Sequence, residues 1–473
     1  MVFSISEVYD VRSIKLDIIR ILVEERKIMF LYLLSVIIRV CIIMAHPLLW
    51  QIKNFLWEQL VLASLEPYLD YLYFYRKFAE AFISGRWLPY ISDAEDPALT
   101  AYAYPPLFLY IISLPALISI DLVFIPLLLA DILLPFLIYH FLKNAQGEEV
   151  AKWGFLATAL CPLSVFYNGG LLFNTSLVTL VLVVSLYFLY HKRFNLAILA
   201  LAVAFLFKQI VIFLFIPILL YAILKSSEDN STIAVYLKYT FKYVGILALT
   251  IFIGSLPWIL LSPSRYLSSI FRGRITLFPH FIPPPINWPV HWYDFLVVLG
   301  APYWLIYILG FLTFTSSGII LVEMANVVLP VYWHQRKTLT WEKLLDLVVY
   351  TAILTHLFFP RGVYKYYFTL HVPLVILWLC FHFRATIVHQ PKETLVKFLL
   401  FSLVILFLHR LIYLLVIWVF LFTMLRIESL KTIQSQECES NKNIGNTVTR
   451  NNEYYSNIAI INTHIFIMTI FFC

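Results

Sequence analysis

The feature that most constrains this chain is a succession of apolar runs about as long as a membrane-spanning helix. Crossing the hydrocarbon core takes roughly 20 apolar residues in helical form. The mean hydropathy of +0.85 and a hydrophobic share of 62% exclude an ordinary water-soluble domain. We therefore predict an all-α fold, a polytopic transmembrane helical bundle of about 10–13 spans. The clearest runs are 29–48, 122–142, 151–167, 171–190, 209–224, 243–262, 344–359 and 366–384.

The sequence predicts one membrane domain with two large loops and short ends. We expect a cytoplasmic amino-terminal segment at 1–28, a transmembrane domain over 29–425, and a polar tail at 426–473 to which we assign no function. Segment 49–103 mixes acidic and aromatic residues, which is typical of amphipathic helices on a membrane surface, and forms the first outer loop. Segment 263–292 is crowded with proline, which cannot continue a helix, and forms the second outer loop.

Three runs leave the number of spans open. The run 194–207 is short, and 295–331 fits either one helix with a half-helix or two helices. The run 395–425 is interrupted by His409 and Arg410. The sequence therefore gives a range of spans and no exact number.

The orientation of the bundle follows from its basic residues, which collect on the cytoplasmic side of membrane proteins. If 105–118 crossed the membrane, the loop with Lys143 and Lys152 and the run 191–193 would both face outward, against that rule. We prefer the alternative, in which 105–118, broken by Pro115, is a re-entrant or surface helix. Unusual polar residues then gather at the outer face: Asp70, Tyr104, Pro105, Pro106, Tyr167, Asn168, Lys208, Arg272, Arg274, Arg361 and Lys365.

Asp70 is the candidate catalytic base. It stands in the sequence EPYLDY of the first outer loop, among aromatic residues that lower the local water content. When a hydroxyl attacks an anomeric carbon that carries a phosphate, one base must take the proton, and no acid is needed because phosphate leaves as an anion. A single carboxylate suffices, unlike the pair of a hydrolase. The alternative is a surface Asp that faces water or pairs with Arg76 or Lys77.

Lys208 is the first candidate for binding a phosphate. Long apolar stretches flank it, and a charge so placed in a membrane protein needs a partner. Its ammonium would offset the charge of a phosphate on a lipid carrier, although a helix-end position or a pair with Asp131 would also explain it. Arg361 and Lys365, in PRGVYKYY, suit phosphate binding at a helix start. Basic residues beside Tyr are also common interfacial anchors.

Two short motifs are expected to shape the site. In Tyr104-Pro105-Pro106, each proline fixes φ and removes a hydrogen-bond donor, so the segment ends the surface loop rigidly. Asn168 precedes two glycines, which permit a tight turn between helices. Its side chain would reach a sugar hydroxyl, or the turn would simply close a helix hairpin.

We assign no catalytic role to the remaining charged and titratable residues. Arg39 and Asp131 are intramembrane charges of opposite sign, and we expect them to pair inside the bundle. His280 and His291 lack the spacing of zinc ligands, so we predict neither a metal site nor a cofactor. The formal net charge of +7 indicates cytoplasmic anchoring and contact with anionic membrane lipid, and no nucleic acid partner.

The order of these elements resembles the GT-C superfamily, glycosyltransferases that use lipid-linked phosphosugars and carry an essential Asp in a long loop after the first transmembrane helix. The resemblance covers about residues 30–225. It includes the dolichyl-phosphate-glucose glucosyltransferases of N-glycan assembly, and segment 85–90 with the following YPP is also similar to GPI-type and prokaryotic polyprenyl-phosphate-mannose mannosyltransferases. The matching positions are Asp70, the YPP segment Tyr104-Pro105-Pro106, the YN turn Tyr167-Asn168 and the FKQ segment Phe207-Lys208-Gln209.

The resemblance implies transfer of a hexose, with inversion at the anomeric carbon, on the non-cytoplasmic face. The donor would be a polyprenyl- or dolichyl-phosphate-linked sugar and the acceptor a glycan or lipid-linked molecule. Two departures leave the hexose open between mannose and glucose. Val165 and Phe166 stand where a His usually precedes the YN turn, and Asp70 stands alone where the mannosyltransferases carry an Asp pair. The single Asp also weakens any dependence on a divalent metal.

Two other functional classes would fit a polytopic chain. A membrane transporter should show two halves with related hydropathy, and the sequence has no such duplication. A non-catalytic subunit of a membrane glycosylation complex would keep the same helical bundle and lack the catalytic base. This chain has a candidate base, Asp70. We expect a multi-pass membrane protein in the plasma membrane of a prokaryote or the endoplasmic reticulum of a eukaryote.

Overall fold

The structure is a computed structural model that describes the chain in segments. These segments are residues 25–49, 51, 70–90, 99, 102, 104–228, 232–267, 269–270, 300–302, 304–305, 339–357, 364–409, 412–417 and 419–420. Several sequence predictions fall outside the described residues: segment 1–24, Arg272, Arg274, His280, His291, Arg361 and the tail 426–473.

The described residues form helices and no strand, so the predicted all-α architecture is confirmed. Long apolar runs fold this way because a backbone in lipid must satisfy its own hydrogen bonds. Short π or 3₁₀ segments are labelled η. In chain order the elements are α2 (Arg26–Met44), η1 (Tyr71–Tyr75), α5 (Arg76–Ile83), α7 (Pro106–Ala116), η2 (Ile120–Phe124), α8 (Ile125–Gln146), α9 (Glu148–Leu160), η3 (Ser164–Gly170), α10 (Thr175–Tyr190), α11 (Phe194–Phe207), η4 (Gln209–Leu214), α12 (Phe215–Ser226), α13 (Ile233–Leu261), α14 (Pro263–Leu267), α18 (Trp341–Leu357), η6 (Lys365–Leu370), α19 (Val372–His382), α20 (Arg384–His389) and α21 (Pro391–Phe407).

Four helices of the described part are long and apolar enough to cross a membrane. They are α2, α8 with η2, α12 with η4, and α13, and a fifth span results if α9 and η3, bent by 64°, count as one. Four shorter apolar helices, α7, α10, α11 and α19, accompany them. The described residues therefore form a polytopic transmembrane bundle, as predicted.

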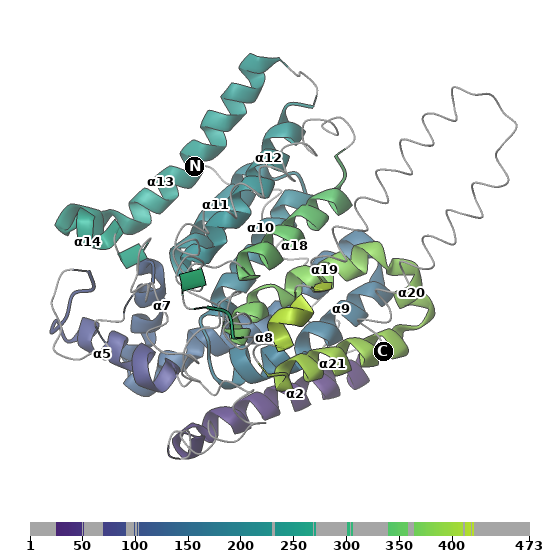
Figure 1. The fold of residues 1–473 in the computed structure, drawn as a ribbon, viewed down its shortest axis with the longest axis horizontal. Helices are drawn as coiled ribbons and strands as arrows, with labels where there is room; N and C mark the ends of the chain where they lie inside the picture. Colours follow the sequence, from purple (N-terminus) through teal and green to yellow (C-terminus); the bar gives the residue numbers. More distant parts are fainter. Residues whose placement is uncertain are drawn as a thin grey trace, which may run out of the picture.

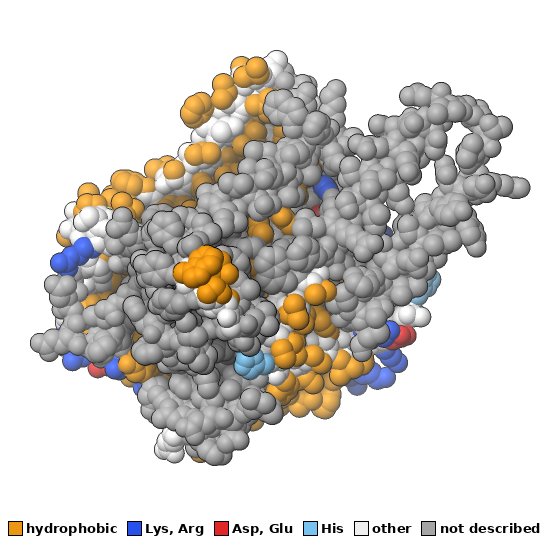
Figure 2. Space-filling model, in the orientation of Figure 1, with side chains coloured by type: hydrophobic (Ala, Val, Ile, Leu, Met, Phe, Trp, Pro, Cys, Tyr) orange, Lys and Arg blue, Asp and Glu red, His pale blue; other side chains and the backbone are white. Residues whose placement is uncertain are grey.

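Apolar side chains cover the outside of the bundle as well as its interior. Figure 1 shows α2 and α13 at opposite edges, with α8 to α11 between them. Both edge helices expose large apolar side chains, including Phe30 (67%) on α2 and Phe241 (75%) on α13. In Figure 2 such side chains line the ridge formed by α13. A surface of this kind needs lipid as its solvent.

Consecutive helices run back and forth, so their connections alternate between two ends of the bundle. One end carries Asn174, which precedes α10, and Lys208, which follows α11. The other end carries Lys143 in the last turn of α8, Lys192 after α10 and Lys225 in the last turn of α12. Because α11 has 14 residues, it separates the two ends by roughly 21 Å. The basic connections thus lie at the end opposite Lys208.

Helix α7 is the element on which the predicted orientation depends. Pro105 is extended, with φ −61° and ψ 158°, and Pro106 begins the helix, where its missing N–H costs nothing. The helix has 11 residues, a length of roughly 16 Å, and it ends one residue after Pro115. This is about half the thickness of the hydrocarbon core. The length agrees with the expectation of a helix that does not cross the membrane.

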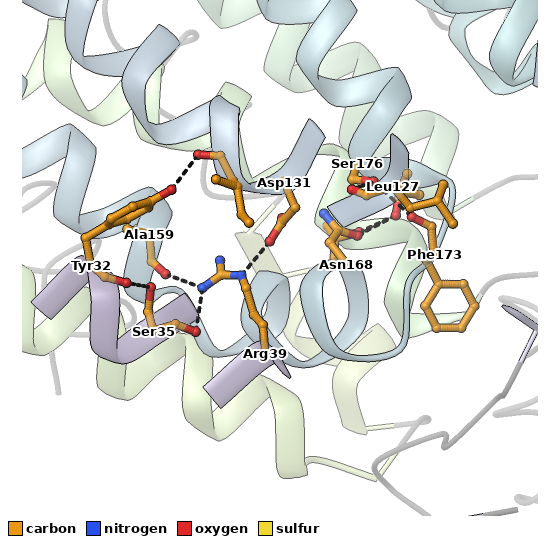
Figure 3. Close-up of polar contacts among 12 residues, drawn as sticks. Tyr32, Ser35, Arg39, Leu127, Asp131, Ala159, Asn168, Phe173 and Ser176 are labelled. Carbon is orange, nitrogen blue, oxygen red and sulfur yellow. Dashed lines mark hydrogen bonds and ion pairs between the residues drawn. The ribbon is translucent and has the colours of Figure 1, made fainter. Parts of the chain in front are cut away.

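A buried ion pair joins the first helix to the centre of the bundle (Figure 3). Arg39 Nε of α2 donates to Asp131 Oδ2 of α8 at 2.6 Å, and both side chains are 2% exposed. The guanidinium also donates to the carbonyls of Ser35, at 3.2 Å, and Ala159, at 3.1 Å. The predicted pairing of Arg39 with Asp131 is confirmed. It requires Gly169 in η3, because a Cβ at that position would lie 2.4 Å from Arg39 Nε.

Candidate active site

Asp70 lies at the start of a helical segment between α2 and α7. It directly precedes η1, a single π-helical turn formed by Tyr71–Tyr75, and α5 continues from that turn. Single π turns are frequent at functional sites. Burial raises the pKa of the Asp70 carboxyl to about 7, while the Lys208 ammonium acts in the opposite direction. Asp70 thus changes its charge near neutral pH.

The alternative partners of Asp70 are engaged elsewhere. Arg76 Nη2 binds Asp121 Oδ1 at 2.5 Å in an exposed pair. Lys77 Nζ lies 5.2 Å from the centre of the Tyr73 ring. Among the described residues, Asp70 forms no hydrogen bond or ion pair with either cation. Its charged neighbour in the structure is Lys208.

Lys208 occupies a break between two apolar helices. Its backbone is extended, with φ −157° and ψ 123°, so α11 ends before it and η4 begins after it. The side chain is 6% exposed, and Nζ donates to Asn174 Oδ1 at 3.1 Å. The ammonium also lies 4.4 Å from the centre of the Tyr367 ring. A pair with Asp131 is not formed, since that carboxylate binds Arg39.

Tyrosines of η6 surround the Lys208 ammonium and connect it with Asp70. The Tyr366 ring lies 5.5 Å from Lys208 Nζ and stacks on Phe173 at 3.9 Å. Tyr366 also interacts electrostatically with Asp70 and Tyr104. Aromatic walls of this kind keep water away and strengthen charge interactions within a site.

The segment Tyr104-Pro105-Pro106 forms one wall of the same site. The Tyr104 ring lies 6.1 Å from the Tyr75 ring, which follows Asp70 by one helical turn. The backbone carbonyls of the segment are fixed by tyrosines, since the Tyr90 hydroxyl donates to Tyr104 O and the Tyr102 hydroxyl donates to Pro105 O at 3.2 Å. This placement fits the expected role of shaping the site.

Asn168 lies beneath the site. Its Oδ1 accepts from the hydroxyls of Thr175, at 2.5 Å, and Thr369, at 2.8 Å, so it ties η3 to α10 and η6. The Tyr167 ring lies 6.4 Å from the Tyr366 ring. Both residues of the YN turn therefore contact η6, the element that carries the tyrosines beside Lys208. Gln209 donates from Nε2 to Ile270 O at 3.4 Å and connects η4 with the segment after α14.

Lys365 lies at the end of α21. Its ammonium donates to the carbonyls of Leu406, at 2.9 Å, and Leu408, at 2.8 Å, and the side chain is 1% exposed. The carbonyls that end a helix lack partners within it, and a cation there stabilises the helix. The hydrogen bonds of this ammonium thus lie at the end of α21, while Arg361, predicted beside it, lies outside the described residues.

Replacing Lys365 with methionine is expected to lower stability and to leave donor binding unchanged. The change removes hydrogen bonds from a charged donor and leaves buried carbonyls unsatisfied, which costs about 1–3 kcal/mol. Thermal unfolding in detergent and the KM for a lipid-phosphosugar donor measure the two effects separately. A raised KM with normal unfolding would instead assign Lys365 to the phosphate, as its sequence motif predicted.

Three residues of the site were missed by the sequence argument. Asn174 receives the Lys208 hydrogen bond, and Tyr366 and Tyr367 surround the ammonium. The tyrosines stood in a motif noted for its cations, and Asn174 looked like an ordinary residue before a helix. In the part of the chain that the structure describes, no group of three or more His, Cys, Asp or Glu side chains is placed to hold a metal ion.

A family model matches the part of the chain that contains the YPP segment, the YN turn and Lys208. The chain has no match among curated proteins. Residues 103–258 match the family described as dolichyl-phosphate-mannose-protein mannosyltransferase, which belongs to the GT-C superfamily. This span includes the YPP segment, the YN turn and Lys208. The resemblance to the GT-C superfamily is thereby confirmed over this third of the chain, and the match indicates a membrane glycosyltransferase of the GT-C type.

Proposed function

We propose that this protein transfers a hexose, mannose or glucose, from a polyprenyl- or dolichyl-phosphate carrier to a glycan or lipid-linked acceptor, with inversion at the anomeric carbon. Asp70 is the general base, and Lys208 binds the donor phosphate. The observation that carries the proposal is the shared environment of these two residues, which come from distant parts of the chain and interact electrostatically among buried tyrosines. The matched family is named for mannose, while the FKQ segment resembles the glucosyltransferases.

The chemistry needs one proton acceptor. The acceptor hydroxyl loses its proton to the Asp70 carboxylate as its oxygen forms a bond to C1 of the sugar. The bond between C1 and the phosphate oxygen breaks, and its electron pair leaves with the phosphate. A carboxyl whose pKa is about 7 suits this step, because about half of it is ionised at neutral pH and it is more basic than an ordinary Asp.

The leaving phosphate needs positive charge more than it needs a proton. It gains charge as the C1–O bond breaks, and a fixed ammonium in a site with little water stabilises that charge most in the transition state. Lys208 is 6% exposed and is held by Asn174 and two tyrosine rings. A lipid-linked donor fits this placement because α11, α12 and α13 around Lys208 present apolar surfaces.

The placement of basic residues supports catalysis on the non-cytoplasmic face. Lys143, Lys192 and Lys225 lie at the end of the bundle opposite Lys208. The positive-inside rule assigns that end to the cytoplasm. Asp70 and Lys208 then face the outside, where lipid-phosphosugars replace nucleotide sugars as donors.

The proposal is tested by transfer in a defined membrane. The purified protein in nanodiscs receives polyprenyl-phosphate carrying labelled mannose or glucose, together with lipid-linked glycan acceptors. We expect label in the acceptor from one of the two donors, with an α-linkage formed from a β-linked donor. Retention of the donor's configuration, or transfer from a nucleotide sugar without any lipid carrier, would contradict the mechanism.

The pH dependence of transfer tests the pairing of Asp70 with Lys208. Because the base must be ionised, kcat/KM should rise with pH toward a midpoint near 7, with roughly a tenfold loss for each unit below the midpoint. The Lys208 ammonium lowers the pKa of Asp70, so Lys208→Met should move the midpoint upward and raise the KM for donor. Lys77→Met, which alters a cation that lies over Tyr73, is the control and should leave the midpoint unchanged. An unshifted midpoint in Lys208→Met would mean that the two residues act independently.

A further inference from the structure

Asn174 does not cap the helix that it precedes. Asn before the first turn of a helix usually accepts hydrogen bonds from the N–H groups of that turn. Asn174 makes no such bond to α10, and its Oδ1 accepts from Lys208 Nζ at 3.1 Å. Its Nδ2 is buried and has no hydrogen-bond partner among the described residues. The Asn174 amide donor is therefore left unsatisfied at the start of α10.

Tyr75 presents a second buried donor to the same place. Its side chain is fully buried, and its ring packs edge to face on Phe108 at 4.9 Å. The hydroxyl lies near the Tyr104 hydroxyl and the Asn174 backbone, yet it forms no hydrogen bond with any described residue. Asp70 interacts electrostatically with the same hydroxyl. Tyr75 therefore links the base to Asn174 across the site.

Buried donors without partners are rare in folded proteins and call for an explanation. Here one of them, on Asn174, lies beside a buried ammonium, and the other, on Tyr75, lies near the Asn174 backbone at the N-terminal end of a 16-residue helix. Helix N-termini favour anions, because their N–H groups are free and the helix dipole is positive there. An anion with two accepting oxygens would satisfy both donors. A phosphodiester, with its two non-bridging oxygens, has that chemistry.

We propose that Asn174 Nδ2 and the Tyr75 hydroxyl donate hydrogen bonds to the non-bridging oxygens of a lipid-linked phosphate held by Lys208 at the N-terminal end of α10. Asn174 has a double role, since its Oδ1 orients the Lys208 ammonium and its Nδ2 contacts the ligand. The inference rests on the proposed function, because it assigns the group that the donor presents to this site. It adds two binding residues, one on either side of the phosphate.

The experiment measures binding of a carrier that cannot react. A short-chain polyprenyl phosphate without sugar and the matching neutral polyprenol are titrated into the full-length protein in nanodiscs. The ratio of the two dissociation constants isolates the phosphate contribution. Tyr75→Phe removes one oxygen and keeps the ring, and Asn174→Asp replaces the Nδ2 donor with an acceptor oxygen while keeping the Oδ1 that accepts from Lys208 Nζ at 3.1 Å. Tyr71→Phe is the matched control, because the Tyr71 hydroxyl lies in the same turn and donates to Asp121 O at 3.4 Å.

We expect the preference for the phosphate to fall about tenfold in Tyr75→Phe, as for loss of one hydrogen bond to a charged group, and at least as much in Asn174→Asp. Tyr71→Phe should stay within about twofold of wild type. A preference unchanged in Tyr75→Phe, or a wild type that binds phosphate and polyprenol equally, would overturn the inference. If the Asn174→Asp variant does not fold, the result for Tyr75→Phe alone tests the inference. Selective binding that both variants weaken, in a protein that transfers no hexose, would uphold the phosphate site and refute the proposed function.

Discussion

Replacing Asp70 with asparagine is expected to lower the rate of hexose transfer by about a hundredfold to ten-thousandfold, the range that general-base catalysis contributes. Asparagine keeps the shape of the side chain and cannot take the acceptor proton. The loss should appear in kcat, because the phosphate contacts through Lys208 are retained. Single-turnover transfer from a preloaded lipid-phosphosugar measures it directly.

Asp121→Asn is the control for that experiment. Asp121 is an exposed carboxylate of the neighbouring η2 and pairs with Arg76 at 2.5 Å. Exposed ion pairs contribute little to stability, so this variant should fold normally and transfer hexose at close to the wild-type rate. Equal rates for wild type and Asp70→Asn, with both inserted and folded, would remove Asp70 from the catalytic mechanism.

Removing one member of the Arg39–Asp131 pair is expected to have the largest effect on stability. In Arg39→Met, the Asp131 carboxylate is left buried without its partner, and such losses cost about 3–5 kcal/mol. The free energy of unfolding in mixed micelles or bicelles measures the cost. The double variant Arg39→Met with Asp131→Leu should recover much of it, because two apolar side chains then replace the pair.

The double variant distinguishes the cost of an unpaired buried charge from the cost of lost packing. If it is as unstable as Arg39→Met, the loss comes from packing against Gly169 and η3 and does not come from an unpaired carboxylate. Transfer activity in the double variant should approach wild type, because neither residue contacts Lys208 or Asp70 among the described contacts.

The helical membrane bundle and the internal ion pair were predictable because membrane physics leaves few choices. Apolar runs of spanning length must form helices, and the opposite charges Arg39 and Asp131 must find partners inside them. Boundaries were predicted less well. Helix α13 begins at Ile233, ten residues before the predicted run at 243, because Lys238 and Lys242 extend a helix past the apolar region. Lysines beside an apolar run lower the local hydropathy, but the helix itself can continue through them.

The candidate site was predictable in part, through residues whose chemistry is costly in lipid. We singled out Lys208 and Asp70 for that reason, and in the structure the two side chains interact electrostatically. Lys365 has the same local signal, yet the structure directs it to the end of α21, a contact across 41 residues that no local pattern reveals. Asn174 was missed because an Asn before a helix is ordinary in sequence. Only its side-chain contacts show that it does not cap α10.

The measurement that tests the central claim most directly is a structure of the protein in lipid with a bound polyprenyl phosphate. The account predicts the phosphate within about 3 Å of Lys208 Nζ, between Asn174 and Tyr75 and facing the Asp70 carboxyl. A phosphate bound at the opposite end of the bundle, such as the pocket lined by Lys192 and Lys225, with none beside Lys208, would contradict it.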